Sequence, residues 1–352
     1  MDRHLFLKRA VLSMLLLCLL LFASCSSGEE RAEEQEEHVI TVGFSQVGAE
    51  SDWRLASTVS MTEAFEEAGF NLIMENARQK PENQLRDVRG FIDQKVDYIV
   101  IDPITEDGWE ATLRDAAQSG IPVIIVDRSV AVSDENLYAA WIGENFELEG
   151  KKACAWLRQF LALRNMKTVN IIHIRGTEGS SAQIGRTKAL EDAAAEYGWN
   201  ILSSADADFV QAKGREVCAD MIAEFGREIQ VVYCENDNEA YGALQALNEA
   251  GIRTGTDIEN GEVLVISFDS SRTGLHYTLY GQIAFNVECS PLYGPDVISL
   301  IRQLEAGEET ERRIYQEESQ FSAFTEISEI EVDGTKYPVE MLTEELLAER
   351  AY

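Results

Sequence analysis

Basic residues are scarce in this chain of 352 residues, which has 30 Lys and Arg against 62 Asp and Glu and a formal net charge of −32. A protein that binds nucleic acid needs clustered Lys and Arg to replace the cations around the phosphates. The charge therefore argues against a nucleic-acid ligand. With 45% hydrophobic and 9% aromatic residues the composition is that of a folded protein, and the length predicts about two domains at ~150 residues each.

Motifs of common enzymes and metal sites are also missing. The chain has no GxSxG, GxxxxGK[ST], HExxH or CxxC, and its four histidines are scattered. We predict that the protein is not an enzyme and has no metal and no cofactor. Buried free thiols are expected at least as readily as disulfides for the cysteines beyond the N-terminal segment, which are Cys154, Cys218, Cys234 and Cys289.

The first 38 residues are predicted to target the protein rather than to fold. Residues 1–24 have a short basic start and an apolar run too short to span a membrane, which indicates a secretory signal. The run ends in Leu-Phe-Ala-Ser before Cys25, which resembles a bacterial lipobox, and the alternative is ordinary secretion with Cys25 as a plain thiol. We expect lipid on Cys25, an acidic tether over 25–38, and an extracytoplasmic protein anchored to the cell membrane.

From residue 39 onward, short apolar runs alternate with amphipathic stretches, a pattern that predicts parallel sheets and doubly wound α/β domains. Two sets of four strands favour two similar lobes. The predicted strands are 39–44, 71–74, 98–102, 122–127, 168–174, 200–203, 230–234 and 263–269. The predicted helices are 54–68, 82–94, 109–118, 147–161, 183–197, 213–225 and 239–249.

Polar and aromatic residues gather at the predicted strand ends, where open α/β sheets bind ligands. Carboxylates, guanidinium groups and amides suit a neutral ligand with many hydroxyls, and an aromatic face covers the C–H side of a sugar ring. Capping of the following helices is the alternative role for each single Asp. The candidate ligand-binding residues are Glu50, Ser51, Asp52, Trp53, Arg54, Asp102, Asp127, Arg128, Arg186, Phe209, Asn236, Asp269 and Glu288.

Several segments carry a family resemblance. Residues 42–48 (VGFSQVG), 50–54 (ESDWR) and 79–84 (QKPENQ), with Asp127-Arg128-Ser129, resemble the type 1 periplasmic sugar-binding proteins, in particular the galactofuranose-binding proteins of ABC importers. The likeness runs from about residue 39 to about 325. It implies two lobes joined by a three-strand hinge, with a sugar between them.

The resemblance also implies residue roles and partners. Trp53 would stack on the sugar ring, Asp127 and Arg128 would hold its hydroxyls from one lobe, and Arg186, Asn236 and Asp269 would do so from the other lobe and the hinge. The protein would be a monomer that captures a monosaccharide, galactofuranose or another aldose, and delivers it to the permease of an ABC importer. The lobes would comprise 39–145 with 291–324, and 146–290 with 325–352.

Three other functions remain open on sequence grounds. A sugar-sensing protein that presents its ligand to a chemoreceptor or histidine kinase would use the same cleft. A regulator of the lactose-repressor type would need a helix-turn-helix where this chain has a signal and tether. An extracellular glycosidase would need two carboxylates flanking the scissile bond, and although Asp127 and Asp269 are conceivable partners, Arg128 would keep Asp127 ionised.

Overall fold

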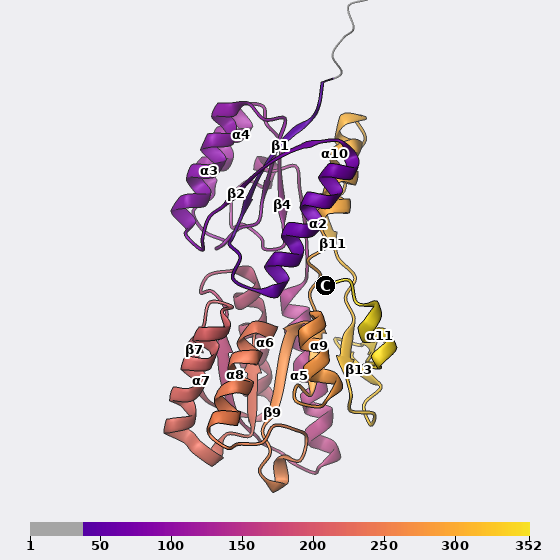
Figure 1. Ribbon diagram of the computed structural model, residues 1–352. Helices are drawn as coiled ribbons and strands as arrows, with labels where there is room; N and C mark the ends of the chain where they lie inside the picture. Colours follow the sequence, from indigo (N-terminus) through magenta and orange to yellow (C-terminus); the bar gives the residue numbers. More distant parts are fainter. Residues whose placement is uncertain (1–37) are drawn as a thin grey trace, which may run out of the picture. The chain divides into compact units, whose positions relative to one another are not determined.

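A computed structural model describes residues 38–352 (Figure 1). The predicted signal peptide, the lipidation site Cys25 and the tether before His38 lie outside the described residues. Among the residues that are described, no helix combines the length and the apolar character needed to cross a membrane.

A six-stranded parallel sheet forms the centre of the first lobe. Its strand order is β11-β5-β4-β3-β1-β2, the order of a doubly wound sheet. Its strands are β1 (Thr41–Gln46), β2 (Asn71–Asn76), β3 (Tyr98–Ile101), β4 (Val123–Val126), β5 (Ala140–Gly143) and β11 (Arg313–Tyr315).

A seven-stranded sheet, in the order β15-β12-β10-β9-β8-β6-β7, forms the centre of the second lobe. All of its pairs are parallel except β10 with β12. Its strands are β6 (Asn170–Arg175), β7 (Asn200–Asp206), β8 (Val231–Cys234), β9 (Leu264–Asp269), β10 (Phe285–Glu288), β12 (Gln320–Ser322) and β15 (Glu340–Met341), and β13 (Glu329–Val332) and β14 (Thr335–Pro338) form a separate hairpin.

Helices cover both faces of each sheet because every central strand is apolar on both sides. In β3, Tyr98 and Val100 pack in one core cluster, whereas Ile99 and Ile101 pack in another on the opposite face. Figure 1 shows α3 and α4 on one side of the first sheet and α2 and α10 on the other. The helices are α2 (Asp52–Ala68), α3 (Pro81–Gln94), α4 (Glu110–Gln118), α5 (Phe146–Leu163), α6 (Ser181–Tyr197), α7 (Gln211–Phe225), α8 (Asp237–Glu249), α9 (Arg272–Leu279), α10 (Gly294–Glu305) and α11 (Glu344–Glu349).

The chain crosses between the two sheets three times, and we call these segments the hinge crossings. The first follows β5, the second follows β10, and the third connects β11 to β12. Backbone hydrogen bonds tie the third crossing to the other two, from Gln316 N to Gly143 O (3.0 Å) and from Glu288 N to Ser319 O (2.9 Å). Two lobes connected by three crossings confirm the predicted fold class.

The structure places residues 320–322 in the second lobe, whereas the sequence analysis predicts them in the first. The sequence analysis places 291–324 in the first lobe, but Gln320 pairs with Val287 and Phe321 with Asn286 in the second sheet. The third crossing therefore lies before Gln320, because the buried β12 completes the hydrogen bonding of β10. The eight predicted strands and seven predicted helices are present with their ends shifted by a few residues.

Candidate functional site

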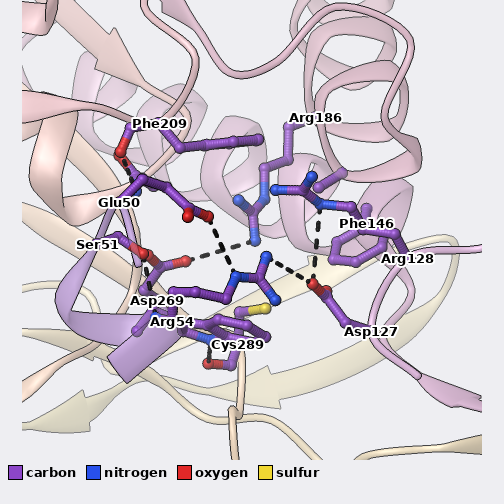
Figure 2. A pocket seen from close by; sticks show the side chains of 13 residues that line it. Glu50, Ser51, Arg54, Asp127, Arg128, Phe146, Arg186, Phe209, Asp269 and Cys289 are labelled. Atoms are coloured by element: carbon purple, nitrogen blue, oxygen red, sulfur yellow. Dashed lines mark hydrogen bonds and ion pairs between the residues drawn. The ribbon is translucent and has the colours of Figure 1, made fainter. Parts of the chain in front are cut away.

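One cavity lies where strand ends of both lobes meet beside the hinge crossings (Figure 2). It is narrow, with about 30 Å³ in which the centres of water-sized molecules can lie. Figure 2 shows three guanidinium groups and three carboxylates converging on it. The lining residues are Glu50, Ser51, Trp53, Arg54, Asp127, Arg128, Phe146, Ala182, Arg186, Phe209, Asn236, Asp269 and Cys289.

Arg54 holds the first-lobe side of the cavity together. Ser51 begins α2 by accepting a hydrogen bond from Arg54 N at 3.1 Å, and this cap fixes the first turn of the helix. The buried guanidinium pairs with Glu50 (Nε to Oε1, 3.1 Å), with Asp127 (Nη2 to Oδ2, 3.2 Å) and with Asp102. Burial alone would lower the pKa of Arg54, but the three carboxylates outweigh it and raise that pKa.

Arg128 and Phe209 meet across the cavity from different lobes. The Arg128 guanidinium lies 4.9 Å from the centre of the Phe209 ring, a cation–π contact. Its Nη1 donates to Ile104 O at 3.2 Å, and its Nε lies 3.8 Å from Asp127 Oδ2. Burial and the nearby Arg54 lower the pKa of Arg128.

Arg186 is the corresponding cation of the second lobe. Its Nε donates to Glu149 Oε2 at 2.7 Å, its Nη1 donates to Glu235 O, and its Nη2 lies 3.8 Å from Asp269 Oδ1. Asn236 lies beside it as the N-cap of α8 and accepts from Glu239 N at 2.8 Å. The second lobe thus matches the first, with a buried arginine facing a carboxylate at a strand end.

Three buried polar atoms of the lining residues have no hydrogen-bond partner among the described residues: Glu50 Oε2, Arg128 Nε and Arg186 Nη2. Buried polar groups are nearly always satisfied, so unpaired ones call for an explanation. Two donors and one acceptor facing a cavity suit a polar ligand that both donates and accepts.

The backbone at three lining residues has a left-handed conformation that few non-glycine residues adopt. The φ angles are 59° at Asp127, 63° at Phe209 and 93° at Asp269. Two of these residues come directly after or at the end of a strand, where the chain turns sharply. Such conformations persist only when surrounding packing enforces them, and they cluster at ligand sites.

The structure brings ten of the thirteen candidate residues to this cavity, and three do not line it. Asp52 is exposed, and its backbone N–H donates to Asn238 Oδ1 at 3.2 Å. Asp102 is fully buried behind Arg54, and burial raises its pKa well above the ordinary value. Glu288 instead pairs with Arg350 Nη1 at 2.6 Å and accepts from Ser319 N at 2.9 Å. These three residues do not line the cavity, and their role as direct ligand residues stays a prediction.

Three lining residues were missed by sequence reasoning, namely Phe146, Ala182 and Cys289. Ala182 stands four residues before Arg186 and so lies on the same face of α6, a signal that was available. Phe146 begins α5 directly after the first hinge crossing, and Cys289 belongs to the second, and no sequence pattern marks these positions. Cys154, Cys218, Cys234 and Cys289 are all free and buried thiols.

Comparisons with known proteins agree with this architecture. Residues 42–309 match the family model described as a periplasmic binding protein domain. The galactofuranose-binding protein of Escherichia coli is 40% identical over 228 residues, which are 64% of this chain and 70% of that protein.

Two solved structures share 34% identity with the chain. A Mycobacterium smegmatis protein in complex with β-D-fucofuranose has a TM-score of 0.76 and covers 81% of this chain and 91% of its own. The binding component of the arabinose ABC transporter of Shewanella, bound to L-arabinofuranose, has a TM-score of 0.74 and covers 80% and 91%.

Proposed function

Because the chain belongs to the periplasmic binding protein domain family, we propose that it binds a monosaccharide in the cavity between its lobes and carries it to an ABC importer. One observation supports this most strongly. Three guanidinium groups and three carboxylates from both lobes line one buried cavity and leave two donors and one acceptor unpaired. A sugar hydroxyl donates and accepts, so it satisfies both kinds of group.

The ring form that we propose is a furanose. Three relatives are described as galactofuranose-binding, fucofuranose-bound and arabinofuranose-bound. The small cavity volume favours a single sugar over an oligosaccharide. Trp53, Phe146 and Phe209 supply apolar surfaces for the C–H side of the ring.

We propose that closure of the two lobes around the sugar leads to its delivery, without any chemical step. A ligand that touches both lobes favours the closed form, and the permease recognises that form. We propose an extracytoplasmic monomer, anchored by lipid on Cys25 and held at a distance by the acidic tether over 25–38. The proposed lobes are 39–145 with 291–319, and 146–290 with 320–352.

The test is a thermal-shift screen of the purified protein against furanose and pyranose sugars, followed by calorimetry on each hit. A ligand that binds only the native state stabilises it by RT ln(1 + [L]/Kd), so a micromolar binder raises the midpoint at millimolar sugar. We expect galactofuranose or a related aldose to give a selective shift. The absence of a shift with every monosaccharide would contradict the proposed function.

Asp127→Asn and Arg128→Ala test the placement of the sugar. Charge-assisted hydrogen bonds contribute about 1.5–3 kcal/mol each, so each change should weaken sugar binding by ~10-fold or more. Asp115→Asn is the matched control, because Asp115 is exposed on α4. Wild-type affinity in both cavity variants would show that the ligand binds elsewhere.

A further inference from the structure

Acidic side chains and one thiol gather behind the cavity, and each hinge crossing contributes one of them. Glu144 follows β5, Cys289 follows β10, and Glu318 lies between β11 and β12, while Glu149 comes from the first turn of α5. Glu144 and Cys289 are 2% exposed and Glu149 is fully buried. We call these four residues the hinge cluster.

Two carboxylates of the hinge cluster accept a hydrogen bond on one oxygen only. Tyr293 Oη donates to Glu144 Oε2 at 2.6 Å, and Arg186 Nε donates to Glu149 Oε2 at 2.7 Å. Oε1 of Glu144, Glu149 and Glu318 is buried and has no hydrogen-bond partner among the described residues when all three are ionised, and a proton on Glu318 would let it hydrogen-bond to Glu149.

The basic side chains near the hinge cluster also bind other groups. Arg186 is shared with Glu235 O and Asp269, and Lys152 Nζ reaches the backbone oxygen of Glu318 at 3.3 Å. Unpaired buried carboxylates must therefore gain a proton or a cation.

The geometry favours a cation at one point of the cluster. Cys289 Sγ and one oxygen each from Glu149 and Glu318 lie within 4.8 Å of one another. Ligand atoms around a tetrahedral zinc ion are about 3.5 Å apart, given metal–ligand distances of about 2.0–2.3 Å. Small side-chain movements therefore suffice to close three ligands around one ion.

We propose that Cys289, Glu149 and Glu318 bind a divalent zinc ion at the hinge. A thiolate with two carboxylates suits zinc, whereas calcium and magnesium prefer oxygen ligands alone. The unpaired Oε1 of Glu144 or a water molecule supplies the fourth position. This site departs from the sequence expectation of no metal, because its ligands are far apart in the chain and follow no motif.

The proposed ion would connect the hinge to the cavity. Its ligands come from the second crossing, the third crossing and α5, which follows the first crossing. Glu149 would bind zinc with one oxygen and hold Arg186 with the other, at 2.7 Å. The effect of zinc on sugar affinity rests on the proposed function, but zinc binding itself does not.

The experiment measures zinc on the purified protein after removal of metal with EDTA and reloading. We expect one equivalent of zinc by elemental analysis, a higher thermal midpoint with zinc, and a thiolate-to-metal charge-transfer band after cobalt substitution. Cys289→Ser and Glu318→Gln should each raise the zinc dissociation constant by at least about tenfold, and Cys289→Ser should abolish the band.

Matched variants separate ligand loss from general destabilisation. Cys218→Ser removes another buried thiol, in a core cluster of the second lobe, and Glu317→Gln changes the exposed neighbour of Glu318. Both should bind zinc as the wild type does. Equal zinc binding in Cys289→Ser and wild type, or a midpoint that does not respond to zinc or EDTA, would overturn the proposal and leave protons as the compensation. Sugar binding measured on the same samples tests the proposed function separately.

Discussion

Arg54 pairs with three carboxylates, from Glu50, Asp102 and Asp127, yet only two of these line the cavity. Asp102 lies behind the guanidinium and fixes it from the protein side. A buried ion pair adds little net stability, but loss of one partner leaves an uncompensated charge at a cost of about 3–5 kcal/mol. The array therefore serves to hold Arg54 in a fixed position toward the ligand space.

Asp237 gives a pH-dependent prediction at the residue scale. Its carboxylate accepts from Ser267 Oγ, Asn286 Nδ2 and the backbone and side chain of Ser271 at 2.7–2.9 Å. Burial nevertheless raises its pKa to about 6, and these hydrogen bonds oppose the rise. The folded protein thus holds this proton more tightly than the unfolded chain, so the contribution to stability is present at low pH and is lost as the pH rises through about 6.

Asp237→Asn tests this prediction, because an asparagine side chain does not titrate. The unfolding free energy of wild type minus that of the variant should fall by about 2 kcal/mol between pH 4 and pH 7, from a pKa difference of about two units. Urea unfolding at several pH values measures it, and the subtraction cancels the other buried carboxyls. A difference that does not vary with pH would show that the pKa of Asp237 is not raised.

Individual residues of the site were predictable where they follow a strand, because parallel strands bring their carboxyl ends to one edge. Asp127, Asn236 and Asp269 were found in this way. Asp102 obeys the same pattern but lies one layer deeper, since Arg54 fills the space in front of it. A sequence pattern predicts which residues lie at the edge of the sheet. It does not predict how far each side chain lies from the cavity, because that depends on packing.

At the scale of elements, two glycines within helices predict opposite results for the same change. Gly90 in α3 has no atom within 4 Å of the position that a Cβ would take. In α8, a Cβ on Gly242 would lie 2.2 Å from Gln211 O and 2.5 Å from Arg215 N, so α7 and α8 pack through their backbones here.

Gly90→Ala should raise the unfolding free energy by roughly 0.5–1 kcal/mol, because alanine loses less conformational entropy in a helix. Gly242→Ala should lower the unfolding free energy, by about 1–3 kcal/mol, because it forces the two helices apart. Urea unfolding of both variants checks the pair. A stabilising Gly242→Ala would show that α7 and α8 have room to separate.

Elements with a long or unbroken apolar pattern were predictable, and elements without one were not. The helix predicted over 213–225 repeats an apolar stripe at Val217, Met221 and Phe225. The four-residue strands β3 and β4 are apolar throughout, whereas β5 ends in glycine and β10 contains two polar residues. β12 has three residues and is defined by its partner β10, so the third crossing could not be placed from local pattern.

At the scale of the whole molecule, both lobes contact each other on the rim of the cavity. Four hydrogen bonds of 2.9–3.2 Å cross from the first lobe to the second. Contacts that exist only in the closed form contribute to ligand affinity by shifting the population toward closure, although they do not touch the ligand. The pairs are Asp52 with Asn238, Gln79 with Asp208, Glu106 with Gly179, and Ser129 with Ser181.

Ser181→Ala tests this account of closure. Ser181 Oγ accepts from Ser129 N at 2.9 Å, and Ser181 does not line the cavity. Loss of one neutral hydrogen bond costs about 0.5–1.5 kcal/mol, so calorimetry should show sugar affinity weakened by roughly 2–10-fold. We expect the ligand-free protein to be open and to lack this contact, so the midpoint without sugar should not change.

Ser299→Ala is the matched control, since Ser299 is exposed on α10 and accepts from Gln303 Nε2 of the same helix at 3.3 Å. Its sugar affinity should equal that of the wild type. If both variants bound sugar equally, the rim contacts would contribute nothing to closure. If Ser181→Ala also lowered the midpoint without sugar, the contact would persist in the ligand-free protein, and affinity would have to come from the cavity alone.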